Sequence, residues 1–399
     1  MSLNSTPTSD RVHIGIFGRR NAGKSSLINA LTNQQLAIVS DIKGTTTDPV
    51  YKTMELLPLG PVVFIDTPGI DDEGELGEQR VKASYRVLAK TDIALLVEED
   101  RELSEEDKAL LQRIKEKNIP YIIVYNKCEK YPDLVPTGEN EIAVSAAEGI
   151  NINELRELIA KQHDSAGEKV RLVADIIKPG DIVGLVVPID KAAPKGRLIL
   201  PQQMAIRDIL DAGAVSVVMR ESELEQTLAQ LGRKPDIVIT DSQAFGMVSK
   251  TVPCDIPLTS FSILMARYKG ILKQAVSGVR GLDRLHDGDR VLISEGCTHH
   301  RQCGDIGTVK LPAWIKEYTK KELQFEFSSG TQFPEDLRGY SLIVHCGGCM
   351  LNEREVRYRL ACAEEQGVPM TNYGILIAYV HGILKRSVEP FEDIARLLD

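Results

Sequence analysis

The chain has 399 residues, of which 43% are apolar and 26% are charged, and this length predicts two or three domains that each bury a core. No apolar run approaches the roughly 20 residues that span a bilayer, which excludes a membrane-spanning protein. The formal net charge of −9 gives no general attraction to nucleic-acid backbones or anionic lipid, so we expect neither nucleic acid nor a membrane as a partner.

The N-terminal sequence MSLNSTPTSDR has neither the apolar core of a signal peptide nor the Arg-rich pattern of a transit peptide. We therefore expect a short disordered lead-in and a cytoplasmic protein. The 7 cysteines are an odd number spread along the chain. This argues against a disulfide framework and favours thiols that act as metal ligands or core residues.

Apolar strand-like runs alternate with helical patterns from Val12 to about His163. The runs are VHIGIF, VVFID, DIALLVE, YIIVYNK and IAVSA, and the helical segments are Lys24–Thr32, Gly77–Lys90, Ser104–Lys117 and Asn151–Lys161. This alternation is typical of a mostly parallel sheet flanked by helices. We predict that residues 1–167 form a first α/β domain.

The sequence GRRNAGKS, from Gly18 to Ser25, fits a phosphate-binding loop between a predicted strand and a predicted helix. Its glycines let backbone N–H groups surround the β-phosphate, Lys24 supplies a cation to the β- and γ-phosphates, and Ser25 ligates Mg²⁺. The alternative is a glycine-rich turn before a helix. The expected nucleotide contacts are Gly18, Arg19, Arg20, Asn21, Ala22, Gly23, Lys24, Ser25 and Ser26.

Three further motifs, DTPG, NKCE and SAA, follow other predicted strands. DTPG places a carboxylate near the Mg²⁺ water shell and a glycine N–H near the γ-phosphate. Because the carboxyl ends of parallel strands meet at one edge of a sheet, all these motifs predict one nucleotide site. The residues expected to contribute are Asp66, Thr67, Pro68, Gly69, Asn126, Lys127, Glu129, Ser145 and Ala146.

The order and spacing of these motifs resemble the translation-factor-like GTPases, especially the group that contains Era and the tRNA-modification GTPase MnmE. In that group an Asn-Lys-x-Asp motif reads guanine, and the resemblance gives this role to Glu129, with one extra methylene. The sequence GTTTD resembles switch I, which implies that Thr46, or else Thr45, completes the coordination of Mg²⁺ in the GTP-bound state. The expected catalytic residues are Lys24, Thr46, Asp66 and Gly69.

Two positions bear on the rate of hydrolysis. Ile70, and not a glutamine that could orient water, follows DTPG, so we expect slow unaided hydrolysis of GTP. Asn21 corresponds to the asparagine that helps bind K⁺ in the resembling family. A K⁺ ion there would supply the charge that an arginine finger supplies elsewhere, and the alternative is a turn-forming residue.

The pattern restarts after a polar stretch at residues 164–169. The runs IVGLVVPI, SVVMR and DIVIT, with helical segments at Gln202–Ala212 and Glu221–Leu231, predict a small α/β module over residues 168–256. It holds no catalytic constellation, so we interpret it as a dimerisation domain. A long helix over Leu258–Leu285 is then expected to lead into a third α/β domain at residues 257–399.

The third domain holds two cysteine motifs, each after a predicted strand. Cys297-Thr-His299 follows VLISEG, and His345-Cys346-Gly-Gly-Cys349 follows SLIVH. If the strands are parallel, three thiols meet at one edge of the sheet. Structural zinc would take these cysteines and one histidine, a [4Fe-4S] cluster would take them and leave a labile position, and buried core cysteines are the third alternative.

These motifs, downstream of a GTPase domain and a middle module, resemble the family of [FeFe]-hydrogenase maturation GTPases over essentially the whole chain. The resemblance implies that Cys297, Cys346 and Cys349 hold a [4Fe-4S] cluster with an exchangeable iron site. His299 and His345 are motif residues whose ligation the resemblance leaves open.

The same resemblance implies a role as scaffold and carrier. Two radical-SAM maturases would supply a di-iron precursor, apo-[FeFe]-hydrogenase would receive it, and GTP hydrolysis would time the exchange. The main alternative is an Era- or MnmE-like GTPase that acts on tRNA or ribosomes and holds structural zinc. A second alternative is a metal-responsive regulator without a delivery role.

Overall fold

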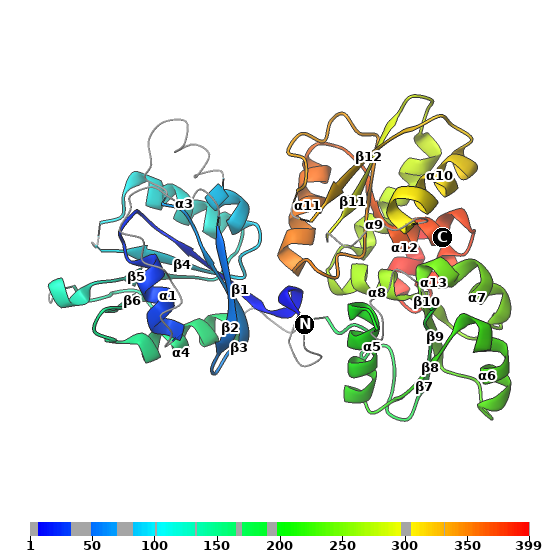
Figure 1. Ribbon diagram of the computed structural model, residues 1–399, viewed down its shortest axis with the longest axis horizontal. Helices are drawn as coiled ribbons and strands as arrows, with labels where there is room; N and C mark the ends of the chain where they lie inside the picture. Colours follow the sequence, from blue (N-terminus) through cyan, green and yellow to red (C-terminus); the bar gives the residue numbers. More distant parts are fainter. Residues whose placement is uncertain are drawn as a thin grey trace. The chain divides into compact units, whose positions relative to one another are not determined.

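The computed structural model describes residues 7–32, 49–69, 83–99, 102–131, 134–164, 170–189, 198–296, 305–330 and 332–398. They belong to two compact units, Met1–Glu168 and Lys169–Asp399 (Figure 1). Both units consist of helices packed on sheets that are mostly or entirely parallel, which confirms the expected α/β fold. Within the described residues, no helix combines the length and apolarity that crossing a membrane requires.

The first unit contains a six-stranded sheet of order β2-β3-β1-β4-β5-β6. Its strands are β1 (Val12–Phe17), β2 (Val50–Leu56), β3 (Gly60–Asp66), β4 (Ile93–Glu98), β5 (Tyr121–Tyr125) and β6 (Glu141–Ala143). All neighbours are parallel except β2 and β3, which are antiparallel. Every residue of β1 is buried, because the central strand is covered on both faces.

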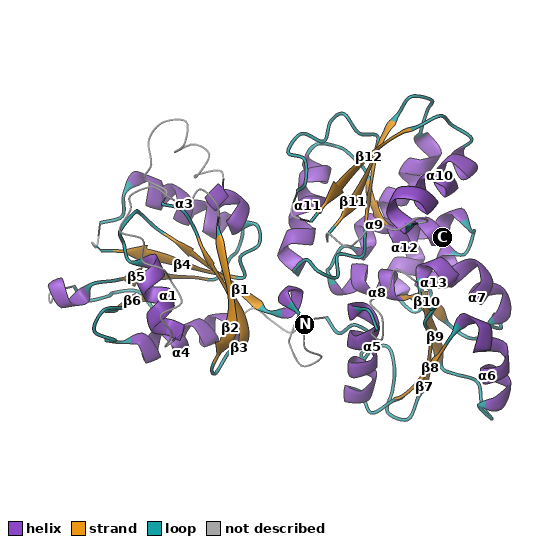
Figure 2. Ribbon diagram, viewed as in Figure 1, coloured by secondary structure: helices purple, strands orange, loops and turns teal. Residues whose placement is uncertain are grey.

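Helices cover both faces of this sheet (Figure 2). They are α1 (Lys24–Thr32), α3 (Glu105–Glu116), α4 (Ile152–Asp164) and a helical segment at residues 83–88. Leu27 of α1 and Leu155 of α4 belong to one apolar cluster, whereas Leu110 of α3 belongs to another with Phe17 and Val63. The sheet therefore separates two cores, and its strand ends are left for polar groups.

The second unit contains two four-stranded sheets, of order β10-β9-β7-β8 and β12-β11-β13-β14, and every strand pair in them is parallel. The strands of the first sheet are β7 (Ile182–Val186), β8 (Val215–Met219), β9 (Ile237–Thr240) and β10 (Leu258–Ser260). Those of the second are β11 (Arg290–Glu295), β12 (Gln324–Ser329), β13 (Leu342–His345) and β14 (Met370–Asn372). One hydrophobic cluster runs through both sheets, so they share a core.

Short helices connect and cover these strands. They are α5 (Leu200–Asp211), α6 (Leu224–Gln230), α7 (Phe245–Thr251), α8 (Phe261–Tyr268), α9 (Leu272–Gly278), α10 (Leu311–Thr319), α11 (Glu353–Glu365), α12 (Tyr373–Val380), α13 (Leu384–Val388) and α14 (Glu392–Ala395). A 3-10 helix (Val279–Arg284) extends α9, and a π-helical segment (Ile306–Lys310) precedes α10.

The expected single helix over Leu258–Leu285 is wrong. Its first residues form strand β10, and the Ser260 hydroxyl then caps α8 by accepting a hydrogen bond from the Ile263 N–H at 3.2 Å. Gly270, with a φ of +70°, follows the end of α8 in the left-handed conformation that glycine adopts readily. Because β10 pairs with β9, the sheet of the middle domain continues past residue 256.

Candidate functional site

Two glycines of the phosphate-binding loop (residues 18–25) lie where no side chain fits. Gly18 has a φ of +134°, and a Cβ there would lie 2.2 Å from the Val97 carbonyl oxygen. Gly23 has a φ of +89°, and its Cβ would lie 2.2 Å from Asn126 Nδ2. The loop therefore approaches both β4 and the NKCE motif closely, and it does so only because these residues are glycines.

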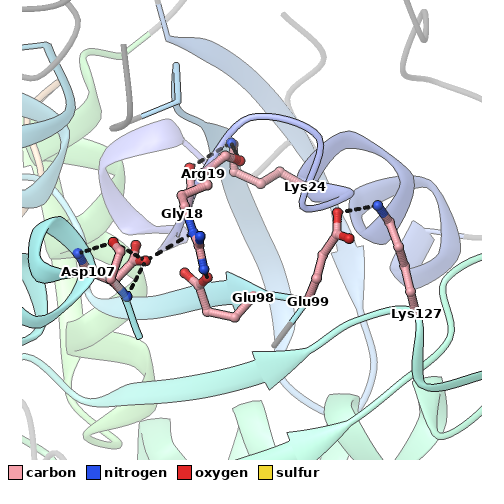
Figure 3. Close-up of polar contacts among 8 residues, drawn as sticks. Gly18, Arg19, Lys24, Glu98, Glu99, Asp107 and Lys127 are labelled. Carbon is pink, nitrogen blue, oxygen red and sulfur yellow. Dashed lines mark hydrogen bonds and ion pairs between the residues drawn. The ribbon is translucent and has the colours of Figure 1, made fainter. Parts of the chain in front are cut away.

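The expected phosphate and magnesium groups lie at the carboxyl ends of β1 and β3. Lys24 is buried, and its Nζ donates to the carbonyl oxygens of Gly18 at 2.8 Å and Arg19 at 2.7 Å (Figure 3). Ser25 Oγ donates to Asp66 Oδ2 at 2.7 Å. The hydroxyl and the carboxylate expected to serve Mg²⁺ are thus in direct contact.

Asn126 links three of the motifs through its side-chain amide. Its Nδ2 donates to the Ala22 carbonyl at 2.9 Å, and its Oδ1 accepts from the Ala146 N–H at 3.1 Å. Lys127, with a φ of +64°, donates to the Asn21 carbonyl at 2.8 Å and forms an ion pair with Glu99. The structure therefore brings the predicted phosphate loop, NKCE and SAA segments together.

Glu129, in the NKCE motif, carries a carboxylate oxygen whose surroundings bear on guanine binding. Hydrogen bonding from Ser145 and from the backbone lowers the pKa of Glu129, so its carboxylate is ionised at neutral pH. Its Oε2 is buried and has no hydrogen-bond partner among the described residues. A buried acceptor without a partner is costly, and the N–H donors of a guanine ring would satisfy it.

Two acidic residues beside the loop were missed by the sequence reasoning. Glu98 ends β4 with 1% of its side chain exposed, and Asp107 in the first turn of α3 has 0% exposed. Arg19 lies between them, with Nη2 3.3 Å from Glu98 Oε2 and Nε 3.3 Å from Asp107 Oδ2 (Figure 3). The sequence did contain a signal for Glu98, because an acidic residue at the end of the apolar run IALLVE indicates a carboxylate at a strand end.

Burial has the largest effect on the pKa of Glu98, and the charge of Asp107 and a hydrogen bond with Asp107 add to this effect. Together they raise the pKa from its usual 4.5 to about 8. Arg19 opposes this rise without cancelling it. Glu98 therefore holds its proton at neutral pH, and its neutral carboxyl group adds no negative charge beside the Arg19 guanidinium.

Some predicted residues lie outside the described residues. They are the switch I sequence Gly44–Asp48, with Thr45 and Thr46, and Ile70 after the DTPG motif. The motif Cys297-Thr-His299 also lies outside them.

A second cluster of interest surrounds Cys346 at the carboxyl end of β13. Its Sγ accepts hydrogen bonds from the backbone N–H groups of Gly296 at 3.0 Å and Gly348 at 3.4 Å. Gly296 immediately precedes Cys297 in the sequence, and Cys349 lies partly buried three positions after Cys346. Among the described residues, no group of three or more histidine, cysteine or acidic side chains is placed to hold a metal ion.

His345 is fully buried beside this thiol, and both of its ring nitrogens have partners. Nδ1 is 2.7 Å from the Cys346 carbonyl oxygen, and Nε2 is 3.2 Å from Nη1 of Arg359. Because arginine only donates, Nε2 accepts and Nδ1 carries the proton. Burial and the Arg359 charge lower the pKa of His345 to about 3, so the ring is neutral and braces the Cys346 backbone.

Arg359 is itself fully buried and fully bonded. Its guanidinium pairs with Glu355 at 2.9 Å, donates to the Gly330 carbonyl at 2.7 Å and lies 5.2 Å from the Phe333 ring centroid. Sequence reasoning did not single out Arg359 or Glu355, which resemble any i,i+4 pair on a helix surface.

Three family models match successive parts of the chain. They are the 50S ribosome-binding GTPase at residues 13–127, the Hydrogen maturase F dimerization domain at residues 172–270, and the Hydrogen maturase F tetramerization domain at residues 273–390. The order confirms a GTP-hydrolysing domain followed by two α/β domains.

Individual relatives match the first part of the chain. The tRNA modification GTPase MnmE of Aquifex aeolicus is 38% identical over 161 residues, which are 38% of this chain and 34% of that protein. GTPase Der of Rickettsia africae is 34% identical over 182 residues, which are 44% of this chain and 40% of that protein. The chain thus spans less than half the length of either relative.

A solved structure of Aquifex aeolicus Era bound to GDP.AlF4⁻ is 23% identical, with a TM-score of 0.32, and the match covers 52% of this chain and 92% of that one.

The raised pKa of Glu98 predicts how the stability of the first unit depends on pH. The folded state holds a proton on Glu98 that the unfolded state releases near pH 4.5, so stability should fall as pH rises from about 5 to about 8. The expected loss is about 1 kcal/mol for each pH unit in this window. Urea unfolding of the full chain between pH 5 and pH 9 would measure it.

Glu98→Gln removes the titrating group and should flatten this pH dependence. Glu105→Gln is a matched control, because the Glu105 side chain is 87% exposed in the same helix turn as Asp107. An unchanged pH slope in Glu98→Gln would contradict the assignment.

Proposed function

Because the chain belongs to the hydrogen maturase F family and carries a GTPase domain before the two domains of that family, we propose that it is a GTPase scaffold for an iron–sulfur cluster. It would receive a di-iron precursor on a [4Fe-4S] cluster and deliver it to apo-[FeFe]-hydrogenase. The observation that carries this proposal is the environment of Cys346.

The Cys346 sulfur suits a cluster ligand because it accepts two backbone N–H groups, and such hydrogen bonds to sulfur help set the properties of iron–sulfur clusters. One of these N–H groups belongs to Gly296, which is the residue before Cys297 in the sequence. Cys297, Cys346 and Cys349 would be the ligands. A cluster held by three cysteines keeps one iron position open, and that position would bind the precursor.

The two histidines of the cysteine motifs, His299 and His345, would have separate roles. The His345 ring is engaged by Cys346 and Arg359, which supports a bracing role beneath the ligand loop. His299, in the same short motif as Cys297, is the candidate for a further interaction with the cluster or its cargo.

The GTPase half would bind GTP with Mg²⁺ between the segments described above. Ser25 and Thr46 would ligate the ion, Asp66 would hold its water shell, and Glu129 would accept from guanine. Asn21 would help bind K⁺, which would assist a slow hydrolysis.

GTP hydrolysis would time the exchange of partners and would not drive bond chemistry. The partners would be two radical-SAM maturases, which supply the precursor, and the apo-hydrogenase, all in the cytoplasm.

A second copy of the chain is a further proposed partner, which would bind at β8, an edge strand within the described part of the chain. This strand lies at the end of the sheet order β10-β9-β7-β8, and Val215 and Val218 on it are 52% and 46% exposed. An edge strand with exposed apolar side chains is a ready template for pairing with another chain. We therefore place the homodimer contact there.

One alternative function has support from the comparisons. The identity to the tRNA modification GTPase MnmE and the match to the 50S ribosome-binding GTPase model favour a GTPase that acts on tRNA or ribosomes. In this alternative, the cysteines would hold structural zinc. The net charge of −9 disfavours this alternative, because nucleic-acid binding relies on basic surfaces.

Loss of a cluster ligand tests the main proposal. After anaerobic reconstitution, the parent protein should be brown with broad visible absorption, and Cys346→Ser should lose this colour because a hydroxyl is a poor ligand for iron in a cluster. Maturation of apo-hydrogenase should fall roughly tenfold or more. Cys254→Ser, at an exposed cysteine, is the control and should keep both. A colourless, zinc-loaded parent protein would refute the proposal and support the alternative.

The timing role of GTP is tested by Lys24→Ala. Removal of the cation should slow GTP hydrolysis by roughly 100-fold and slow multi-turnover maturation, while the cluster absorption stays. Lys161→Ala, at an exposed lysine of α4, is the matched control. If Lys24→Ala matures hydrogenase as fast as the parent, GTP does not time the exchange.

The proposed dimer contact is tested by Val218→Lys, which places a charge on the edge strand. Light scattering after size-exclusion chromatography should show a smaller assembly than the parent forms, because burial of an unpaired charge disfavours association. Val135→Lys makes the same change at a valine that is 64% exposed in the first unit and should leave the assembly unchanged. A parent-like mass for Val218→Lys would place the contact elsewhere.

A further inference from the structure

Two buried carboxyl groups beside one arginine are an unusual feature next to a phosphate-binding loop. Glu98 and Asp107 have 1% and 0% of their side chains exposed, whereas the Arg19 side chain is 34% exposed. Burial of charged groups costs several kcal/mol for each ion unless close partners offset it, so a fold that needed only packing would place apolar residues here. Glu98 Oε1 and Asp107 Oδ1 have no hydrogen-bond partner within the described part of the chain.

Arg19 belongs to the phosphate loop, and both its side chain and its backbone form polar contacts. Its guanidinium contacts Glu98 at 3.3 Å, and its own carbonyl oxygen accepts a hydrogen bond from Lys24 Nζ at 2.7 Å. Figure 3 shows these contacts of the Arg19 side chain and carbonyl group. Immobilisation of the Arg19 side chain therefore also fixes the backbone that orients Lys24.

Glu99, the residue after Glu98, contacts the segment that carries the guanine motif. Glu99 forms an ion pair with Lys127, and Lys127 donates to the Asn21 carbonyl at 2.8 Å. Two consecutive acidic residues, Glu98 at the end of β4 and Glu99 after it, thus contact Arg19 of the phosphate loop and Lys127 of the guanine motif.

Asp107 also belongs to the start of α3. Its carboxylate accepts from the Ser104 hydroxyl at 2.6 Å and from the Ser104 N–H at 3.3 Å, and its own N–H donates to Ser104 Oγ at 3.2 Å. This capping box makes the beginning of the helix rigid. Arg19 is therefore held from a strand end and from a capped helix start, neither of which belongs to a nucleotide motif.

From this geometry we propose that Glu98 and Asp107 are positioning residues of the GTPase site, which set the phosphate-binding loop for the nucleotide by holding Arg19. They do not touch the nucleotide. The inference concerns the first unit alone and does not depend on the thiol site or on hydrogenase maturation.

A double-mutant cycle on the full chain tests this inference. Asp107→Asn removes the charge but keeps an oxygen that can accept from Ser104, and Arg19→Ala removes the group through which it acts. We expect each single variant to bind GDP and GTP about tenfold more weakly, with a higher KM and a smaller change in kcat. The double variant should be about as weak as the single variants and should not show the roughly 100-fold loss of two independent effects.

Two control variants separate positioning from stability. Glu105→Gln alters an exposed carboxylate in the same helix turn and should leave nucleotide affinity unchanged. Ser104→Ala breaks the capping box and keeps the Asp107 charge, so it should lower the melting temperature with less than a twofold change in affinity. Multiplicative losses in the cycle, or a Ser104→Ala variant as weak as Asp107→Asn, would overturn the proposal.

The dependence of nucleotide affinity on pH distinguishes a positioning role of Glu98 from a role in packing, because a packing role alone would not make the affinity depend on pH. The charged groups that face Glu98 are Asp107 from α3 and Arg19 from the loop. Loss of the Glu98 proton above about pH 8 places a further negative charge beside the loop, so the affinity of the parent protein for GTP should fall there.

Glu98→Gln keeps an oxygen that can accept from Arg19 but cannot titrate, so the affinity of this variant for GTP should not change between pH 7 and pH 9. If its profile falls as the parent's does, Glu98 has no such role.

Discussion

A parallel sheet that is covered on both faces leaves only its strand ends for polar groups, and both clusters of candidate functional residues depend on this constraint. In the first unit, the groups expected to bind phosphate, Mg²⁺ and guanine follow β1, β3, β5 and β6. In the second unit, Gly296 and Cys346 follow β11 and β13, two paired strands. The strands are buried and apolar, so they hold these short loops in fixed register with one another.

Each unit also has an arginine–carboxylate cluster beside its site. In the first unit, Arg19 of the phosphate loop contacts the buried carboxyl groups of Glu98 and Asp107. In the second unit, the buried Arg359 pairs with Glu355 and contacts the ring of His345. Such clusters cost desolvation energy, and hydrophobic residues often replace them without loss of stability. The advantage of these clusters is the direction of their hydrogen bonds. A guanidinium with several donors holds the neighbouring loops in one position, whereas apolar contacts would let the loops shift.

The two units contribute different kinds of information about function. The first unit resembles GTPases with several different roles, so it establishes the reaction and not the partner. The second unit matches domains of a single family, and in our proposal its thiol site would give the GTPase its specific purpose. Under our proposal, a nucleotide switch would be coupled to a domain that carries a metal cluster, as suits a carrier whose partners exchange in a fixed order.

Sequence alone determined the class of fold and the identity of the chemical groups. The phosphate loop, the DTPG and NKCE motifs and the strands VHIGIF and IALLVE were recognisable because local periodicity and glycine spacing are written in consecutive residues. The edge strand β2 was missed because VYKTMEL is largely exposed and lacks a long apolar run. The single helix expected over Leu258–Leu285 failed because Ser260 and Gly270 break it, and such local signals compete with helical periodicity.

Only the tertiary structure showed which groups meet across long separations in the sequence. Arg19 and Asp107 are 88 positions apart, and the thiol of Cys346 is 50 positions from the amide of Gly296. Burial decided their chemistry as well, because it retains a proton on Glu98 and keeps His345 neutral. A pKa depends on solvent and charge in three dimensions, and the residue types by themselves carry neither.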